Sequence, residues 1–179
     1  MNLNIEFKET ERKVLEFLFL KSGKTFTPHQ ISKKLNISSP AILSALRSLK
    51  SKDIVKMEKN EVGRFSVKLN RDNMLVLGLK RAWNLEILYR TGFVKSLYDY
   101  FPGATVILFG SYSNGEDTCK SDIDIAVVGM KRVEVNMKKF ENILEREINI
   151  EFFDSFKNID KHLLNSLLNG IVLKGVVDI

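Results

Sequence analysis

The first 70 residues predict three short helices followed by a hairpin. Apolar positions at helical spacing mark the first helix, over residues 10–21. Thr27-Pro28-His29-Gln30 opens the second, because threonine caps a helix, proline suits its first turn and glutamine completes a capping box. Ser39-Pro40 opens the third in the same way. Two extended stretches, 54–59 and 64–69, predict the hairpin. The apolar residues expected inside the first and third helices are Val14, Leu15, Leu18, Phe19, Ile42, Leu46 and Leu49.

The middle of the chain, from 72 to 100, continues in a helical pattern. Gly78 and Gly92 are expected to break or bend it, so one helix and two helices both remain open. The stretch is too apolar for a flexible linker, and we expect it to pack against its neighbours. Phe101-Pro102-Gly103 ends it sharply.

The rest of the chain predicts strands that alternate with helices. Residues 105–109 form an apolar, β-rich run that is typical of a buried strand, and a second such run covers 125–128. A third strand is expected over 148–153. Helical stretches are predicted at about 135–146 and 160–169.

Composition agrees with the predicted elements and limits the kinds of site that the chain can form. Of the 179 residues, 44% are apolar and 28% are charged, which excludes disorder throughout the chain. No apolar run suits a membrane span, and charges throughout the first twenty residues argue against a signal peptide, so we expect a cytoplasmic protein with no membrane partner. Cys119 is the only cysteine and there are two histidines, His29 and His162, so we expect carboxylates to hold any metal.

The net charge of +6 is concentrated in the first 70 residues, which hold 14 basic and 7 acidic side chains. The remaining residues hold 14 basic and 15 acidic ones. This asymmetry favours a nucleic-acid-facing half joined to a half of another kind. A surface made soluble by lysine explains the charge equally well.

The stretch "TPHQISKKLNISSPAILSALRSLKSKDIV" resembles the helix-turn-helix of winged-helix DNA-binding domains, with the hairpin in place of the wing. The resemblance covers residues 8–70, and Asp53 stands where such domains usually have glycine. It implies double-stranded DNA as a partner, with the helix from Pro40 in the major groove. A winged helix that contacts protein instead is the alternative. The residues that the resemblance implies at DNA are Ser39, Leu43, Ser44 and Arg47 on this helix, and Lys59 and Arg64 on the wing.

Candidate chemistry follows the strand at 105–109. That strand ends in Gly110-Ser111, a pair that offers close backbone approach and N–H groups for phosphate oxygens. After ten residues comes Asp122-Ile123-Asp124, in which strand alternation places both carboxylates on one face. Because adjacent carboxylates repel, a shared divalent cation explains them best. Glu151 lies among apolar residues of the third strand and is the favoured third acid, with Asp154 as its competitor.

These residues, within "LFGSYSNGEDTCKSDIDIAVV", resemble the nucleotidyltransferase superfamily of DNA polymerase beta, and more closely its minimal nucleotidyltransferases. The resemblance covers about residues 95–179. It implies a small mixed sheet flanked by helices, with two Mg²⁺ ions held by Asp122, Asp124 and Glu151. It also implies that Gly110 and Ser111 bind the phosphates of ATP. Many members have arginine where this chain has Asn114.

The two resemblances together predict an α+β chain, a winged helix-turn-helix followed by a small nucleotidyltransferase fold. The expected domains are 1–70 for the winged helix, 71–102 for a helical connector and 103–179 for the nucleotidyltransferase.

Three functions remain open. The first is a Mg²⁺-dependent nucleotidyltransferase that transfers NMP, with AMP expected, to a protein or other acceptor hydroxyl; the resembled group includes antitoxins that modify a separate HEPN-type toxin. The second is a DNA-binding regulator whose transferase fold senses nucleotide or holds a partner. The third is an antibiotic nucleotidyltransferase, which the lack of an evident further substrate domain disfavours. A homodimer is also left open.

Overall fold

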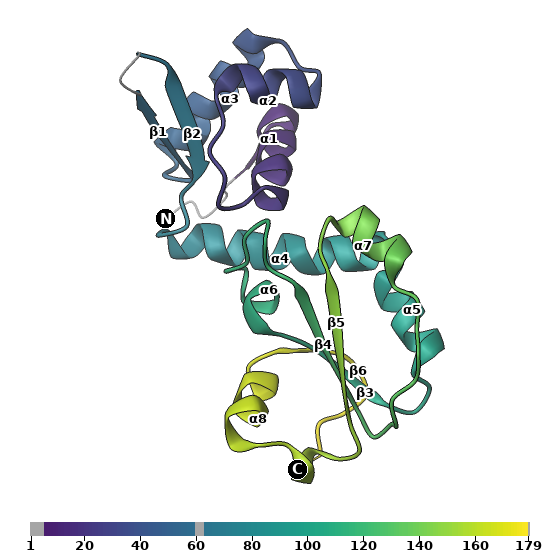
Figure 1. The fold of residues 1–179 in the computed structure, drawn as a ribbon. Helices are drawn as coiled ribbons and strands as arrows, with labels where there is room; N and C mark the ends of the chain where they lie inside the picture. Colours follow the sequence, from purple (N-terminus) through teal and green to yellow (C-terminus); the bar gives the residue numbers. More distant parts are fainter. Residues whose placement is uncertain (1–5, 60–62, 179) are drawn as a thin grey trace. The chain divides into compact units, whose positions relative to one another are not determined.

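A computed structural model describes residues 6–59 and 63–178, and their packing divides the chain into two units, Met1–Val76 and Leu77–Ile179 (Figure 1). The division falls inside one helix, α4 (Met74–Arg90). The bounds of 1–70, 71–102 and 103–179 stay predictions. No helix in the described part of the chain combines the length and apolar character needed to cross a membrane.

The N-terminal unit contains the three helices and the hairpin that the sequence predicts. Thr27 and Gln30 form the expected capping box: the Gln30 N–H donates to Thr27 Oγ1 at 3.2 Å, and the Thr27 N–H donates to Gln30 Oε1 at 2.7 Å. All seven apolar residues expected inside the first and third helices are buried. The elements are α1 (Glu9–Leu20), α2 (Pro28–Leu35), α3 (Ser39–Ser51), β1 (Val55–Lys59) and β2 (Phe65–Leu69), with the two strands antiparallel.

Asp53 takes the backbone conformation that the glycine of similar domains would supply, with a φ of +55° between α3 and β1. Aspartate tolerates this left-handed region better than most residues. The Asn70 side-chain amide donates to the Asp53 carbonyl oxygen at 2.9 Å and to its carboxylate at 3.0 Å. Asn73 donates to the same carbonyl at 3.0 Å. These bonds hold the turn that leads from α3 into the hairpin.

The C-terminal unit is built on a mixed four-stranded sheet of order β5-β4-β3-β6 (Figure 1). Strands β4 and β5 are parallel, and β3 is antiparallel to both β4 and β6. Together with the N-terminal unit, this arrangement confirms the predicted α+β class. The further elements are α5 (Phe93–Tyr100), β3 (Thr105–Phe109), α6 (Gly110–Asn114), β4 (Ile123–Val128), α7 (Lys138–Leu144), β5 (Ile148–Phe153), a 3₁₀ turn (Phe156–Asn158), α8 (Lys161–Leu168) and β6 (Ile171–Lys174).

Three details differ from the sequence prediction. Gly78 does not break the helix: it lies inside α4, and only Gly92, with a φ of +76°, separates α4 from α5. A helix interior tolerates one glycine at a cost of about 1 kcal/mol when the rest of the helix packs. The helix predicted at 135–146 is shorter, because it begins at Lys138. Strand β6 was not predicted, because its four residues are too few to show a clear period.

The two faces of the sheet have separate cores. Ile123, Ile125 and Val127 of β4 pack on one face with residues of α5 and α7. Ala126 and Val128 of β4 pack on the other face with residues of α8 and of the 3₁₀ turn. Because side chains alternate along a strand, Asp124 belongs to the α8 face.

Buried charges tie α4 to the loop between α6 and β4. Lys80 and Asp117 are both fully buried and form an ion pair, and Asn84 donates to the same Asp117 oxygen at 2.7 Å. Arg146 Nη2 lies 3.6 Å from the second Asp117 oxygen. Asn84 also donates to the Tyr112 carbonyl in α6 at 2.8 Å. Because a buried charge without its partner is costly, this network fixes the loop to α4.

Replacing Lys80 by methionine should destabilise the fold strongly, because it leaves the fully buried Asp117 carboxylate without its ion-pair partner. We expect a loss of about 3–5 kcal/mol in the free energy of unfolding, measured with urea. Arg90→Met on the same helix is the control, since Arg90 pairs with Glu86 at the surface and should lose only about 0.5 kcal/mol. Equal losses in the two variants would show that the buried pair does not hold α4 in place.

Candidate functional site

The Gly110 backbone lies directly against the carboxylate of Asp124. Strand β3 ends at Phe109, which pairs with Asp124 of β4, and Gly110 follows with a φ of +72°. A Cβ atom at this position would lie 2.6 Å from Asp124 Oδ2, and the positive φ would strain any other residue, so both features favour glycine. The predicted Gly110-Ser111 pair and one of the predicted acids therefore meet where β3 turns into α6. Ser111 is half-buried in this short helix.

Asp122 and Asp124 share one partner, Asn149 of β5. The Asn149 side-chain amide donates to Asp122 Oδ2 at 3.0 Å and to Asp124 Oδ1 at 3.4 Å. Burial raises the pKa of the Asp124 carboxyl above its ordinary value, and the nearby charge of Asp122 adds to this rise. The hydrogen bond from Asn149 partly offsets the rise in pKa. The two acids thus lie together on one side, as the alternation of the sequence predicts.

Glu151 occupies a different place in the register. Asn149 pairs with Asp124, whereas Glu151 pairs with Ala126, two residues further along the parallel strands. Its side chain shares a sheet face with Asn149, and it is exposed. Among residues 6–59 and 63–178, no group of three acidic, histidine or cysteine side chains is gathered closely enough to hold a metal. Asp154, the competing third acid, follows the end of β5 and is exposed.

Asn149 is a site residue that reasoning from the sequence alone missed. The alternation in "INIEFF" puts Asn149 and Glu151 on the same face of the strand, which is the signal that could have found it. An asparagine next to two acids also offers a carbonyl oxygen if its amide turns over.

The donor set fits a hard divalent cation. Asp122 and Asp124 offer carboxylate oxygens, which are the ligands that Mg²⁺ prefers. A cation between the two acids would also offset the repulsion between their carboxylates.

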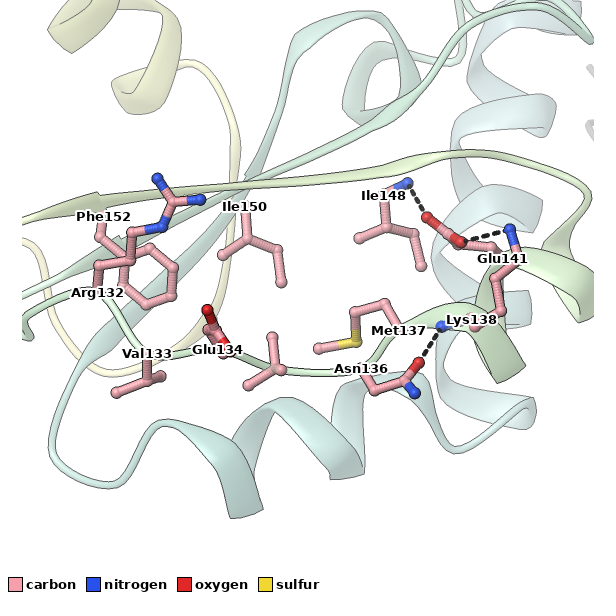
Figure 2. Close-up of a pocket in the computed structure, with 11 residues that line it drawn as sticks. Arg132, Val133, Glu134, Asn136, Met137, Lys138, Glu141, Ile148, Ile150 and Phe152 are labelled. Atoms are coloured by element: carbon pink, nitrogen blue, oxygen red, sulfur yellow. Dashed lines mark hydrogen bonds and ion pairs between the residues drawn. The ribbon is translucent and has the colours of Figure 1, made fainter.

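A cavity of about 640 Å³ lies on the other face of the sheet. Figure 2 shows Ile148, Ile150 and Phe152 of β5 lining it opposite the segment 132–138. These residues alternate with Asn149 and Glu151, so the cavity and the acidic residues are on opposite sides of β5. The Ile148 N–H donates to Glu141 Oε1 at 3.3 Å at one end of the cavity. This space is therefore separate from the candidate site.

The residues predicted to contact DNA lie at three places in the N-terminal unit. Ser39, Leu43 and Arg64 line a cavity of about 540 Å³ between the starts of α2 and α3 and the hairpin. Ser44 and Arg47 are exposed on α3 and lie outside that cavity. Lys59 is exposed at the end of β1, with its Nζ 5.6 Å from the centre of the Phe65 ring. The hairpin turn, residues 60–62, is outside the described part of the chain.

Comparison with known protein families finds a match in the C-terminal part of the chain. Residues 91–172 match the family model described as a nucleotidyltransferase domain. The matched stretch contains Gly110, Ser111 and the three predicted acids. This match supports a transferase of nucleotidyl groups in the C-terminal unit. No curated protein matches the chain by sequence.

Solved structures similar to the chain include a transcription regulator, a repressor and a protein bound to DNA. MepR, a transcription regulator of the Staphylococcus aureus multidrug efflux pump MepA, is 18% identical with a TM-score of 0.42; the match covers 51% of this chain and 65% of MepR. The adhesin competence repressor AdcR of Streptococcus pyogenes is 21% identical with a TM-score of 0.41, over 55% and 70% of the two chains. Lactococcus lactis ZitR in complex with DNA is 21% identical with a TM-score of 0.39, over 57% and 67%. The description of the N-terminal unit as a winged helix rests on its own elements.

Proposed function

We propose that the C-terminal unit is a Mg²⁺-dependent nucleotidyltransferase that transfers AMP from ATP to an acceptor hydroxyl. The observation that carries this proposal is the contact between the Gly110 backbone and the Asp124 carboxylate, with Asp122 beside it. A backbone that approaches a pair of carboxylates this closely suits a ligand that is both phosphorylated and metal-bound. The family match over residues 91–172 supports the same reaction class.

Each residue then has a role in the reaction. Asp122 and Asp124 would hold Mg²⁺, and Glu151, two positions further along β5 than Asn149, is the proposed third ligand. Two bound ions would neutralise the charge of the phosphates and orient the reacting groups. Gly110 and Ser111 bind the β- and γ-phosphates through N–H and hydroxyl groups. The acceptor oxygen attacks the α-phosphorus in line, the bond to the β-phosphate oxygen breaks, and pyrophosphate leaves. The acceptor proton passes to the Glu151 carboxylate.

A second candidate is a DNA-binding regulator that only senses nucleotide or holds a partner. Asn149 favours it, because its amide already donates to both Asp122 and Asp124 and so satisfies the two carboxylates from within the protein. In this function the fold binds nucleotide without transferring it.

Incubation of the full chain with Mg²⁺, α-labelled ATP and an extract of its own cells should label a specific acceptor and release pyrophosphate. Glu151→Gln should keep most of the nucleotide affinity and lose transfer at least about a hundredfold, because proton removal matters mainly in the transition state. Asp124→Asn should impair both binding and transfer. Asp99→Asn, an exposed acid of α5, is the control and should label normally.

The outcomes of this experiment separate the candidates. Label that appears only from γ-labelled ATP would indicate phosphoryl transfer and contradict the mechanism. Nucleotide binding without labelling of any acceptor would favour the regulator. The labelled band itself identifies the acceptor, including a HEPN-type toxin if it is one.

We propose further that the N-terminal unit binds double-stranded DNA through α3 and the hairpin. The basic excess of the first 70 residues and the exposed Arg47 on α3 support this proposal. Ser39, Leu43 and Arg64 line the cavity between α3 and the hairpin. We expect the sugar-phosphate backbone or a base edge of DNA to lie there.

Arg47→Ala in the full chain should weaken binding to duplex DNA about tenfold, because it removes a charge-assisted contact, and should lower the salt dependence of binding. Lys13→Ala is the control, since Lys13 pairs with Glu9 on α1 and should bind as wild type. Fluorescence anisotropy at several salt concentrations measures both effects. Affinity that stays the same in both variants, or that does not change with salt, would favour a protein-contact role for this unit.

A further inference from the structure

A second cavity, of about 580 Å³, opens directly beside Gly110. Its walls come from three elements: Arg81 of α4, Gly110 and Asn114 of α6, and the polar side of α8. His162, Asn165, Ser166 and Asn169 recur at helical spacing and line it, while Leu163, Leu164 and Leu167 of the same helix pack against the sheet. The polar side of α8 therefore faces this space.

The cavity suits a negatively charged ligand. Its lining contains no carboxylate, and Arg81 is its one permanently charged side chain. Arg81 is exposed, and no carboxylate in the described ranges is paired with it. The other lining side chains, those of His162 and the asparagines among them, can donate hydrogen bonds. Such a set of donors around one guanidinium is typical of a phosphate site.

Backbone packing fixes Arg81 at the edge of this cavity. Gly115, directly after Asn114, has a φ of +75°, and a Cβ there would lie 2.7 Å from the Arg81 backbone nitrogen. Helix α4 and the end of α6 thus touch through their backbones. One turn of α4 holds both Arg81 and Lys80, whose ion pair with Asp117 is buried. The backbone of Arg81 is therefore fixed at the edge of the cavity.

Gly110 is the common boundary of the cavity and the acidic pair, because it lines the cavity while its backbone lies against Asp124. We propose that this cavity holds the terminal phosphates of a nucleoside triphosphate and that Arg81 is a direct phosphate ligand. The inference rests on the proposed function, since it assumes that the metal held by Asp122 and Asp124 binds the α-phosphate. A triphosphate then runs from the acids past Gly110 to Arg81.

Titration calorimetry of the full chain with Mg²⁺ and three probes, ATP, inorganic triphosphate and AMP, tests this assignment. Arg81→Gln should weaken ATP and inorganic triphosphate about ten- to a hundredfold, because a charge-assisted hydrogen bond is lost, and change AMP less than about twofold. Arg81→Lys should recover part of the loss. Arg90→Gln, on the same helix and away from the cavity, should bind all three probes as wild type. Thermal unfolding confirms that each variant is folded.

The results also separate this inference from the proposed function. Equal ATP affinity in Arg81→Gln and Arg90→Gln would overturn the assignment, as would a wild type that binds no inorganic triphosphate or an Arg81→Gln variant that loses AMP as strongly as ATP. Binding that depends on Arg81 without any AMP transfer by the wild type would uphold the phosphate site and refute the transferase. AMP transfer by the wild type, with an ATP affinity that does not depend on Arg81, would uphold the transferase and refute the phosphate site.

Discussion

The buried pairing of Lys80 with Asp117 is the constraint on which the C-terminal unit depends. Both charges are removed from water; Asn84 donates to the same Asp117 oxygen as Lys80, and the Arg146 guanidinium lies 3.6 Å from the other oxygen. Asp117 lies in the loop that connects α6, which begins at Gly110, to the strand that carries the acids. Because removing Lys80 would leave a buried carboxylate without its partner, this pairing holds the loop against α4.

This constraint makes α4 part of the candidate site rather than a spacer. The helix contributes the buried Lys80 to the loop, a backbone surface to Gly115 and an exposed arginine to the cavity beside Gly110. The arginine that we propose as a phosphate ligand, the close-approach glycine and the pair of acids are thereby brought together from segments far apart in the sequence. The arrangement gives electrostatic positioning, the main contribution that a protein makes to phosphoryl and nucleotidyl transfer.

Local signals explain which features the sequence could predict. The capping box of Thr27, the strands 105–109 and 148–153 and the proximity of the two acids all follow from residues close in sequence. The continuity of α4 through Gly78 does not, because packing decides it. The register of β5 against β4 also depends on long-range pairing. The sequence therefore pointed to Glu151, whereas the strand neighbour of Asp124 is Asn149. The position of Arg81 beside Gly110 likewise depends on tertiary packing, so the sequence could not predict it.

In the mechanism that we propose, Asp122 and Asp124 hold the metal of a nucleotide-binding site that Gly110 borders. Anomalous diffraction from crystals of the full chain grown with Mn²⁺ and a non-hydrolysable ATP analogue tests it most directly, because Mn²⁺ prefers the same oxygen ligands as Mg²⁺. The account predicts anomalous density between the two carboxylates, with the phosphates of the analogue beside Gly110. Anomalous density elsewhere, or an analogue bound in the cavity lined by Ile148, Ile150 and Phe152, would contradict it.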